Sequence, residues 1–146
     1  MKQNKIFIQF IKLFVYVYRS TKGKVGGFIN GHHVLLLTTV GRKTGLVRTN
    51  PVLYDRVGDD LIMVASAGGA PFHPGWYYNL KANPTVKVEL GPVEQTRVAR
   101  IATPEERPFF WNRMVLKHPG FADYQRKIKR LLPIVVLSPA PSEQAE

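Results

Sequence analysis

Few residues of this chain could do chemistry, and the most prominent group is a cationic turn between two apolar runs. Arg42, Lys43 and Arg48 stand at or just after the turn Gly41–Gly45. Glycines at both ends of a turn permit positive φ and let backbone N–H groups converge on an anion. An arginine can grip a phosphate with two hydrogen bonds, and a lysine adds a mobile point charge. We therefore expect an anion site here, with a solvated basic turn as the alternative.

The chain lacks the side-chain sets from which most enzymes build a reactive centre of their own. It has no cysteine, which excludes thiol nucleophiles, disulfides and thiolate metal sites. No pair of its histidines has the spacing of a metal site on one element, so no metal is expected. Ser66 lies in A-S-A-G-G, which is not the nucleophile elbow of a serine hydrolase. Such a chain can still be an enzyme if a cofactor supplies the chemistry.

Around and beyond the turn, a succession of motifs occurs that is hard to obtain by chance. T-T-V-G-R-K-T-G is followed by N-P-V-L-Y, by V-A-S-x-G-G and by P-G-W-Y-x-N-L-x-A-N-P-x-V-x-V. This order resembles the deazaflavin-dependent nitroreductase family, over about residues 30–138. The resemblance implies a split β-barrel that binds the hydroxy-deazaflavin coenzyme F-420.

The resemblance also implies which residues bind the cofactor. Coenzyme F-420 carries a phosphodiester and an oligoglutamate tail, which suit the cationic turn, and a flat ring, which suits small residues that let backbone N–H groups approach. For Trp76 the alternative is a core aromatic. The implied cofactor-binding residues are Arg42, Lys43, Thr44, Gly45, Arg48, Pro51, Ser66, Ala67, Gly68, Gly69, Trp76 and Asn79.

The acceptor side is implied for the segment H-P-G-F-A-D-Y, residues 118–124. Nitroimidazole-activating relatives typically present tyrosines here, whereas this chain keeps only Tyr124 and has other residues at two positions. That departure argues against nitro-drug activation and leaves hydride transfer untouched. Ordinary core packing is the alternative for Phe121 and Tyr124. The expected substrate contacts are His118, Phe121, Tyr124 and Trp76, and the expected catalytic residues are Tyr124 and Ser66.

Together the residues and the resemblance predict an oxidoreductase that passes a hydride from reduced coenzyme F-420 to a lipophilic, electron-poor acceptor such as a quinone or a nitroaromatic. Two alternatives stay open: a deazaflavin carrier without turnover, and a flavin mononucleotide-dependent reductase on the same barrel. A nucleic-acid-binding barrel would need exposed aromatics among the bases. The aromatics cluster at 7–18, 72–78 and 109–124, away from the basic hairpin, so no nucleic-acid partner is expected. The oligomeric state is not determined.

Positive charge gathers in the N-terminal third of the chain. Residues 1–54 contain nine Lys or Arg and no acid, whereas residues 55–146 contain twelve bases and ten acids. An anionic partner is therefore expected to meet the N-terminal third.

The first twenty residues have the pattern of an amphipathic helix. Apolar residues recur at steps of three and four and share one face: Phe7, Phe10, Ile11, Phe14 and Tyr18. The run is too short to span a bilayer and lacks the cleavage site of a signal peptide. We expect residues 1–20 to contact an anionic membrane, in a cytoplasmic protein held at the inner face of the cell membrane. The alternative is a helix packed on its own domain.

These residues must be positioned by a small, mainly β domain of the α+β class. Strands are predicted at 34–39, 46–57, 61–66, 85–90, 93–101 and 133–137, and a short helix at 76–82. Thr103 to Glu106 is a capping box that starts a helix ending near Lys117, and a second helix follows with an apolar stripe to Leu131. We expect an amphipathic helix and linker at 1–26, an antiparallel split barrel at 27–138 and a disordered tail at 139–146.

Overall fold

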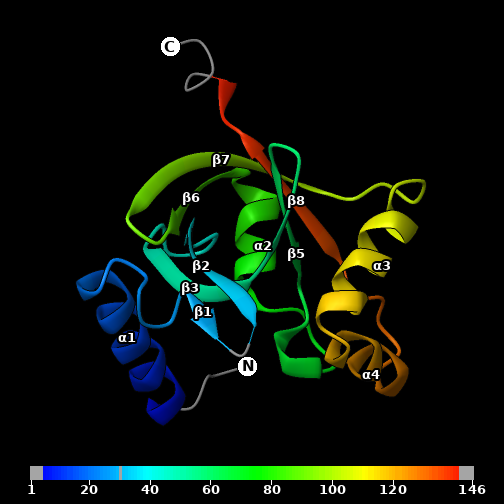
Figure 1. Cartoon of the computed structure of the whole chain (residues 1–146), viewed down its shortest axis with the longest axis horizontal. Coiled ribbons are helices and arrows are strands. Elements are labelled where there is room, and N and C mark those ends of the chain that lie inside the picture. Colours follow the sequence, from blue (N-terminus) through cyan, green and yellow to red (C-terminus); the bar gives the residue numbers. More distant parts are fainter. Residues whose placement is uncertain (1–4, 30, 142–146) are drawn as a thin grey trace.

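The computed structural model describes residues 5–29 and 31–141, which form one curled antiparallel sheet surrounded by helices (Figure 1). The strands are β1 Phe28–Ile29, β2 His32–Val40, β3 Val47–Leu53, β4 Asp55–Val57, β5 Asp60–Val64, β6 Thr85–Leu90, β7 Val93–Ile101 and β8 Ile134–Pro139. The helices are α1 Lys5–Ser20, α2 Gly75–Ala82, α3 Arg107–Lys117 and α4 Gly120–Lys127, with a short 3-10 turn, η1 Ala67–Gly69. This architecture agrees with the predicted α+β, mainly β fold class.

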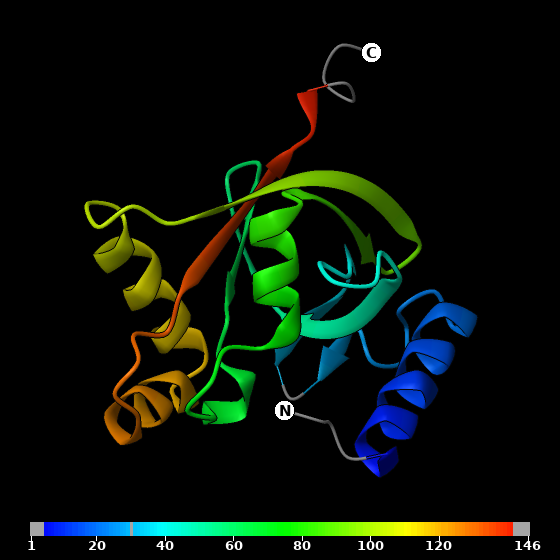
Figure 2. The same cartoon turned by 180° about the vertical axis from the view of Figure 1, so that it is seen from behind.

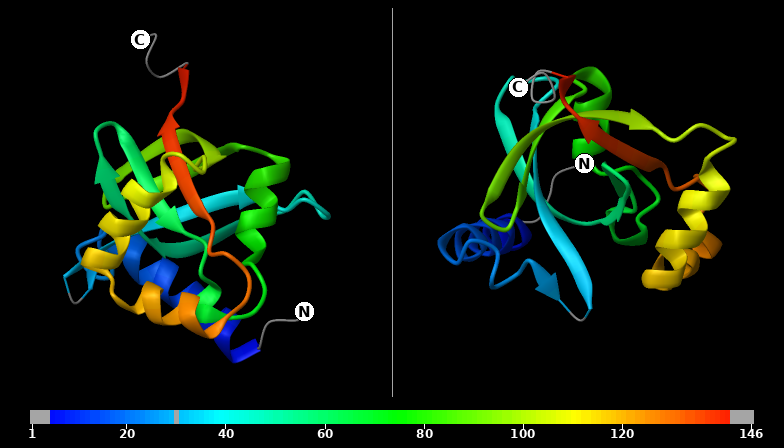
Figure 3. Two further views of the ribbon diagram at one scale, coloured as in Figure 1. Left: turned by 90° about the vertical axis from the view of Figure 1, so that its right-hand side faces the viewer. Right: turned by 45° about the horizontal axis from the view of Figure 1, so that its top comes forward.

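The sheet curls because residues 47–57 contribute a strand near each of its ends: β3 pairs with β2, and β4 pairs with β5 (Figure 3). The strand order is β1-β2-β6-β7-β8-β5-β4, and β3 pairs with β2. The single strand expected over 46–57 is wrong: the chain leaves β2 after Tyr54, whose N–H still donates to the His33 carbonyl, and Asp55 then pairs with Ile62 of β5. Pro51 lies in β3, which pairs with β2 alone among the described strands, as expected for a residue that cannot donate to a ladder.

The central strands are apolar without interruption because both of their faces are covered. Side chains alternate across a strand, so Leu35 and Leu37 join the barrel interior while Leu36 lies under α1. Strands β5 and β8 follow the same rule and turn their outer residues towards α3 and α4. These outer residues are Ile62, Val64, Ile134 and Val136.

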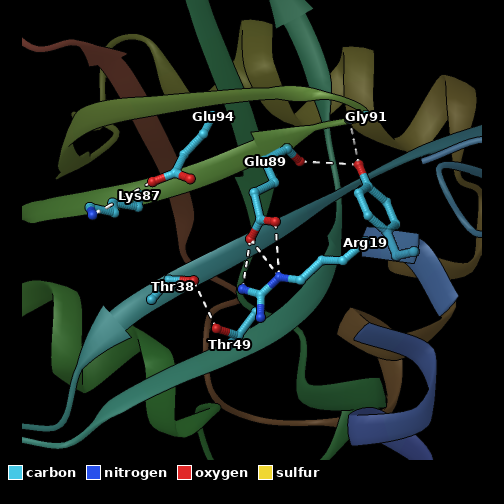
Figure 4. Close-up of polar contacts among 8 residues, drawn as sticks. Arg19, Thr38, Thr49, Lys87, Glu89, Gly91 and Glu94 are labelled. Carbon is cyan, nitrogen blue, oxygen red and sulfur yellow. Dashed lines mark hydrogen bonds and ion pairs between the residues drawn. The ribbon is translucent and has the colours of Figure 1, made fainter. Parts of the chain in front are cut away.

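One side of helix α1 packs on its own barrel, as the alternative interpretation of the N-terminal segment predicted. Tyr18 is buried, and its hydroxyl lies 3.0 Å from the Val34 carbonyl and 3.1 Å from the Glu89 carbonyl while accepting from the Gly91 N–H at 2.9 Å. Burial raises the pKa of the Tyr18 phenol. Arg19 adds an ion pair to Glu89 at 2.8 Å (Figure 4), but half-exposed pairs contribute little to stability. No helix in the described ranges is both long and apolar enough to cross a bilayer.

The late helices are shorter than predicted. The capping box makes its two reciprocal bonds, from the Thr103 N–H to the Glu106 carboxylate and from the Glu106 N–H to the Thr103 hydroxyl, but it closes a turn and α3 begins only at Arg107. Helix α4 ends at Lys127, so the stripe to Leu131 is wrong. The Gln125 side chain bonds the Arg130 carbonyl and the Leu132 N–H, which holds this segment as an irregular link to β8.

The C-terminal tail begins later than predicted. Pro139 ends β8 and pairs with Arg97, and the Ala140 N–H donates to the Thr96 carbonyl. Ala140 is buried, so a disordered tail starting at residue 139 is wrong at its start. Residues 142–146 lie outside the described residues.

Candidate cofactor and substrate site

A cavity of about 1550 Å³ lies between α1, β3, the loop after β5 and the start of α2. Figure 2 shows α2 in front of the curled sheet, with α1 to one side and α4 to the other. Four of the described lining residues are Lys or Arg and none is Asp or Glu. The predicted site residues that line it are Arg42, Lys43, Thr44, Arg48, Pro51, Ser66, Ala67, Gly68, Trp76, Asn79 and Phe121.

The hairpin turn, residues 41–48, is tight and carries its cations outward. The Gly41 N–H donates to the Leu46 carbonyl at 2.7 Å, and the Gly45 N–H donates to the Gly41 carbonyl at 2.9 Å. The expected positive φ occurs at Gly45, at 74°, but not at Gly41. Glycine suits position 41 for another reason, because a Cβ there would lie 3.0 Å from the Leu46 carbonyl oxygen and 2.9 Å from the Thr44 hydroxyl. The side chains of Arg42, Lys43 and Arg48 are exposed.

Asn79 anchors the hairpin turn from α2. Its side chain is only 5% exposed. Its Oδ1 accepts from the Arg42 backbone N–H and from the Arg42 guanidinium, both at 3.1 Å, and its Nδ2 donates to the Thr39 hydroxyl at 3.2 Å. The Arg42 guanidinium also lies over the Tyr78 ring, 4.9 Å from its centroid. The Asn79 amide is therefore occupied by the protein itself and orients Arg42.

The glycine loop, residues 65–70, forms the part of the cavity wall that follows β5. Three successive residues have positive φ: Ala67 at 50°, Gly68 at 64° and Gly69 at 83°. Two bonds close the turn, from the Gly69 N–H to the Ser66 carbonyl and from the Ala70 N–H to the Ala67 carbonyl. A left-handed alanine costs on the order of 1 kcal/mol and persists only where surrounding contacts impose it. The backbone here is held in a shape that it would not choose alone.

Arg130 imposes that shape, and sequence reasoning missed it. Its guanidinium donates to the carbonyls of Ser66 at 2.7 Å, Ala70 at 3.0 Å and Ala65 at 3.1 Å. It also lies 2.9 Å from Nδ1 of His73, a cavity residue. In the sequence Arg130 is one of several cations near the end of α4, and no local signal distinguishes it.

The predicted acceptor segment is only partly at the cavity. Phe121 lines it, as does Trp76, whereas His118, Tyr124, Gly45 and Gly69 are not among the lining residues. Tyr124 packs on the glycine loop, where a Cβ on Gly69 would lie 2.7 Å from its ring.

His118 is a core residue of this structure. It is 6% exposed, and its ring centroid lies 4.2 Å from that of His32. Neither of its ring nitrogens has a hydrogen-bond partner in the described part of the chain. Burial, then the neighbouring His32, lowers the pKa of His118. Among the described residues, no cluster of three or more His, Cys, Asp and Glu could hold a metal ion.

Helix α1 supplies a further wall that the sequence did not reveal. Phe7, Phe10, Ile11 and Lys12 line the cavity. The expected apolar face of this helix is confirmed, but its surroundings change along the helix, because Tyr18 is buried against the barrel whereas Phe10 is 63% exposed at the cavity. The aromatic clusters also do not stand apart from the basic turn, since α1 and α2 bring them to the same cavity. The separation in sequence used against nucleic-acid binding is therefore not a separation in space.

Comparisons with known proteins agree on one family. The F420H(2)-dependent quinone reductase family matches residues 10–139. An F420H(2)-dependent quinone reductase of Mycobacterium tuberculosis is 36% identical over 140 residues, which cover 93% of this chain and 94% of that protein.

Solved structures point the same way. An F420-H2 dependent reductase, FDR-A, superposes with a TM-score of 0.67 and 42% identity over 72% of this chain and 93% of its own. A second structure, of a domain-swapped dimer, gives a TM-score of 0.70 and 34% identity over 90% of this chain and 97% of its own. The predicted split barrel, deazaflavin cofactor and reductase class are thereby confirmed. The chain belongs to the F420H(2)-dependent quinone reductase family.

Proposed function

We propose that the cavity holds reduced coenzyme F-420 and that a quinone accepts the hydride within it. One observation carries this proposal. A cationic turn and a glycine loop with unusual backbone geometry line the same cavity, and none of its described lining residues is acidic. The cations suit a phosphodiester and an acidic tail, and the small residues suit a flat ring.

The residues divide by the part of the cofactor that they would hold. Arg42, Lys43 and Arg48 bind the phosphodiester and the oligoglutamate tail, and Lys12 of α1 adds a fourth cation to the same cavity. Ser66, Ala67 and Gly68 meet the ring. The two bonds that close the loop use the N–H groups of Gly69 and Ala70, so we assign the N–H groups of Ala67 and Gly68 to the ring carbonyls.

When bound, reduced coenzyme F-420 supplies a hydride. A quinone that takes up this hydride and one proton becomes a hydroquinone. Trp76 and Phe121 give the acceptor an apolar surface that excludes water, which strengthens the polar contacts that remain. The proton comes from water or from Tyr124, which packs on the glycine loop beside the cavity. Nitroaromatics are a second, poorer class of acceptor, because Phe121 offers no hydroxyl.

A cofactor titration with turnover tests the proposal. Oxidised coenzyme F-420 should bind more tightly than flavin mononucleotide, and the protein should accelerate oxidation of the reduced cofactor by a soluble naphthoquinone. Tight binding without acceleration would identify a carrier. Stronger binding of flavin mononucleotide would contradict the proposed cofactor and favour a flavin mononucleotide-dependent reductase.

The outer face of α1 is proposed to rest on an anionic membrane, from which a lipophilic quinone can enter. Leu13 and Tyr16 do not line the cavity and are 60% and 69% exposed, on a helix that also carries the exposed Lys5. Because Tyr18 is in the core, deleting the helix would damage the fold and a point substitution is the better test. Leu13→Asp should reduce sedimentation with anionic vesicles. Leu131→Asp is the matched control, since Leu131 is 61% exposed and lies at the other end of the chain.

A further inference from the structure

Within the described residues, the Arg130 guanidinium makes all four of its hydrogen bonds to one stretch of chain, residues 65–73. It reaches the carbonyls of Ala65, Ser66 and Ala70, which lie within six residues, and then Nδ1 of His73. An arginine has five N–H donors in a planar fork, so one side chain can make all of these bonds. A lysine ammonium presents its donors from a single point and cannot span them.

Two other guanidinium groups, those of the buried Arg97 and the half-buried Arg107, also bind carbonyls, but they stabilise the frame of the barrel. Arg97 donates to the carbonyls of Asp59 and Leu137, and Arg107 donates to the carbonyl of Leu132. None of the five residues Arg97, Arg107, Asp59, Leu137 and Leu132 lines the cavity. The group held by Arg130 is different, because Ser66 and His73 both line it.

The contact with Arg130 also determines where His73 carries its proton. A guanidinium is always a donor, so Nδ1 of His73 must be the acceptor at 2.9 Å and lacks a proton. The neutral ring then carries its hydrogen on Nε2. Burial, followed by the charges of Arg130 and Lys81, lowers the pKa of His73 and favours this neutral form. The neighbouring rings are Tyr77 and Tyr78, with centroids 4.5 and 5.7 Å away.

We propose that Arg130 is a positioning residue that fixes the glycine loop and presents the Nε2–H of His73 to a conjugated carbonyl oxygen of a ligand in the cavity. This inference rests on the proposed function, because both the deazaflavin ring and a quinone carry such an oxygen. A neutral imidazole donates this hydrogen bond without giving up its proton, so no bond breaks at His73. Its effect is to orient the carbonyl and to stabilise negative charge that develops on it.

Nitrogen-15 NMR of the histidine rings tests the positioning role without turnover. In the free wild-type protein, His73 should show a bare Nδ1 and a protonated Nε2. In Arg130→Met, the Nδ1 signal should move towards the average of the two tautomers, and in Lys129→Met, which removes the exposed neighbouring cation, it should not. A wild-type ring protonated on Nδ1, or an unchanged signal in Arg130→Met, would overturn the proposal.

Two binding arms identify the carbonyl that His73 contacts. His73→Phe should weaken either the binding of oxidised coenzyme F-420 or the apparent binding of a soluble naphthoquinone, read as KM, by about tenfold, the value of one hydrogen bond. His73→Gln, which retains an N–H donor, should recover most of that loss. Arg130→Lys should weaken the same arm as His73→Phe, whereas a purely structural role would lower thermal stability and leave KM and cofactor affinity unchanged.

The proposed function and this inference fail in different ways. Wild-type protein that does not bind coenzyme F-420 contradicts the proposed function, and the ring tautomer in the free protein still decides whether Arg130 positions His73. Wild-type binding and turnover, together with a His73→Phe variant that matches wild type in both arms, contradict the inference alone.

Discussion

The two loops that line the cavity are built in opposite ways. The hairpin turn carries exposed cations, and a single buried amide, that of Asn79, holds its backbone from outside. The glycine loop has no charged residue of its own, three left-handed residues in succession, and three carbonyls held by Arg130. The first loop offers charge that water already solvates, and the second offers a backbone shape that the rest of the protein maintains.

This difference implies a division of labour. Attraction between exposed charges acts over about 10 Å at moderate salt and tolerates loose geometry. Hydride transfer needs two carbon atoms close to contact, so the surface beneath the reacting ring must be rigid. We therefore expect the hairpin turn to contribute most of the cofactor affinity and the glycine loop to fix the position of the reacting ring.

Removing the cations should have the largest effect. Arg42→Ala combined with Lys43→Ala should weaken coenzyme F-420 binding by on the order of ten- to a hundred-fold, because charge-assisted hydrogen bonds to the phosphate are lost. Rising salt should weaken wild-type binding and affect the double variant less. Fluorescence titration measures both. Lys87→Ala on β6 is the control. If the double variant bound coenzyme F-420 as tightly as Lys87→Ala, the phosphate site would have to lie elsewhere.

Releasing the backbone of the hairpin turn should have the next largest effect. Asn79→Ala removes the acceptor for the Arg42 N–H and guanidinium and the donor to Thr39. We expect a loss of roughly 1–3 kcal/mol in the free energy of unfolding and about tenfold in cofactor affinity. Denaturant unfolding and titration measure the two quantities. Unchanged affinity at lowered stability would show that the cations need no fixed turn.

Changes at the acceptor side should alter turnover by a few-fold. Phe121→Tyr adds a hydroxyl at the cavity and should raise nitroaromatic reduction relative to quinone reduction. Tyr124→Phe should lower turnover about three- to ten-fold if its hydroxyl gives the proton, and change little if the ring only packs on Gly69. The measurement is the steady-state rate of oxidation of the reduced cofactor by a quinone and by a nitroaromatic, for the wild type and each variant. If either variant weakened cofactor binding as much as it changed turnover, the proposed division between the two sides of the cavity would be contradicted.

The smallest expected effect is a loss of folding stability in acid that arises from His118. The pKa of His118 is lower in the folded protein than its ordinary value of 6.5, so the unfolded chain binds the proton more readily. Stability is therefore retained above about pH 6.5 and lost as pH falls below it. His32, Asp55 and Lys117 are the charged or titratable groups that act on this ring.

His118→Phe keeps the aromatic contact with Phe121 and should reduce that loss. The measurement is the thermal midpoint at about pH 8 and about pH 5, compared with His33→Phe, which changes an exposed histidine of β2 next to His32. If the midpoint of His118→Phe falls with acid as far as that of the wild type, another group controls the acid response.

The sequence alone determined the features that depend on neighbouring residues. Alternation and apolar runs located most of the strands, and two glycines with three cations located the hairpin turn. The capping box at Thr103 and Glu106 formed its predicted bonds. The motif order also led to the deazaflavin family and its split barrel, because those motifs carry the turns and small residues of the cavity.

Only the tertiary structure decided which distant residues share the cavity. The sequence did not separate Arg130 from the cations beside it, because its partners lie about sixty residues away. It did not show that α1 forms a wall of the cavity, that the strand over 46–57 divides after Tyr54, or that the His118 ring contacts the His32 ring. Local patterns report what a residue prefers next to its neighbours. The curl of the sheet decides which of these residues meet, because it joins strands from both ends of the chain.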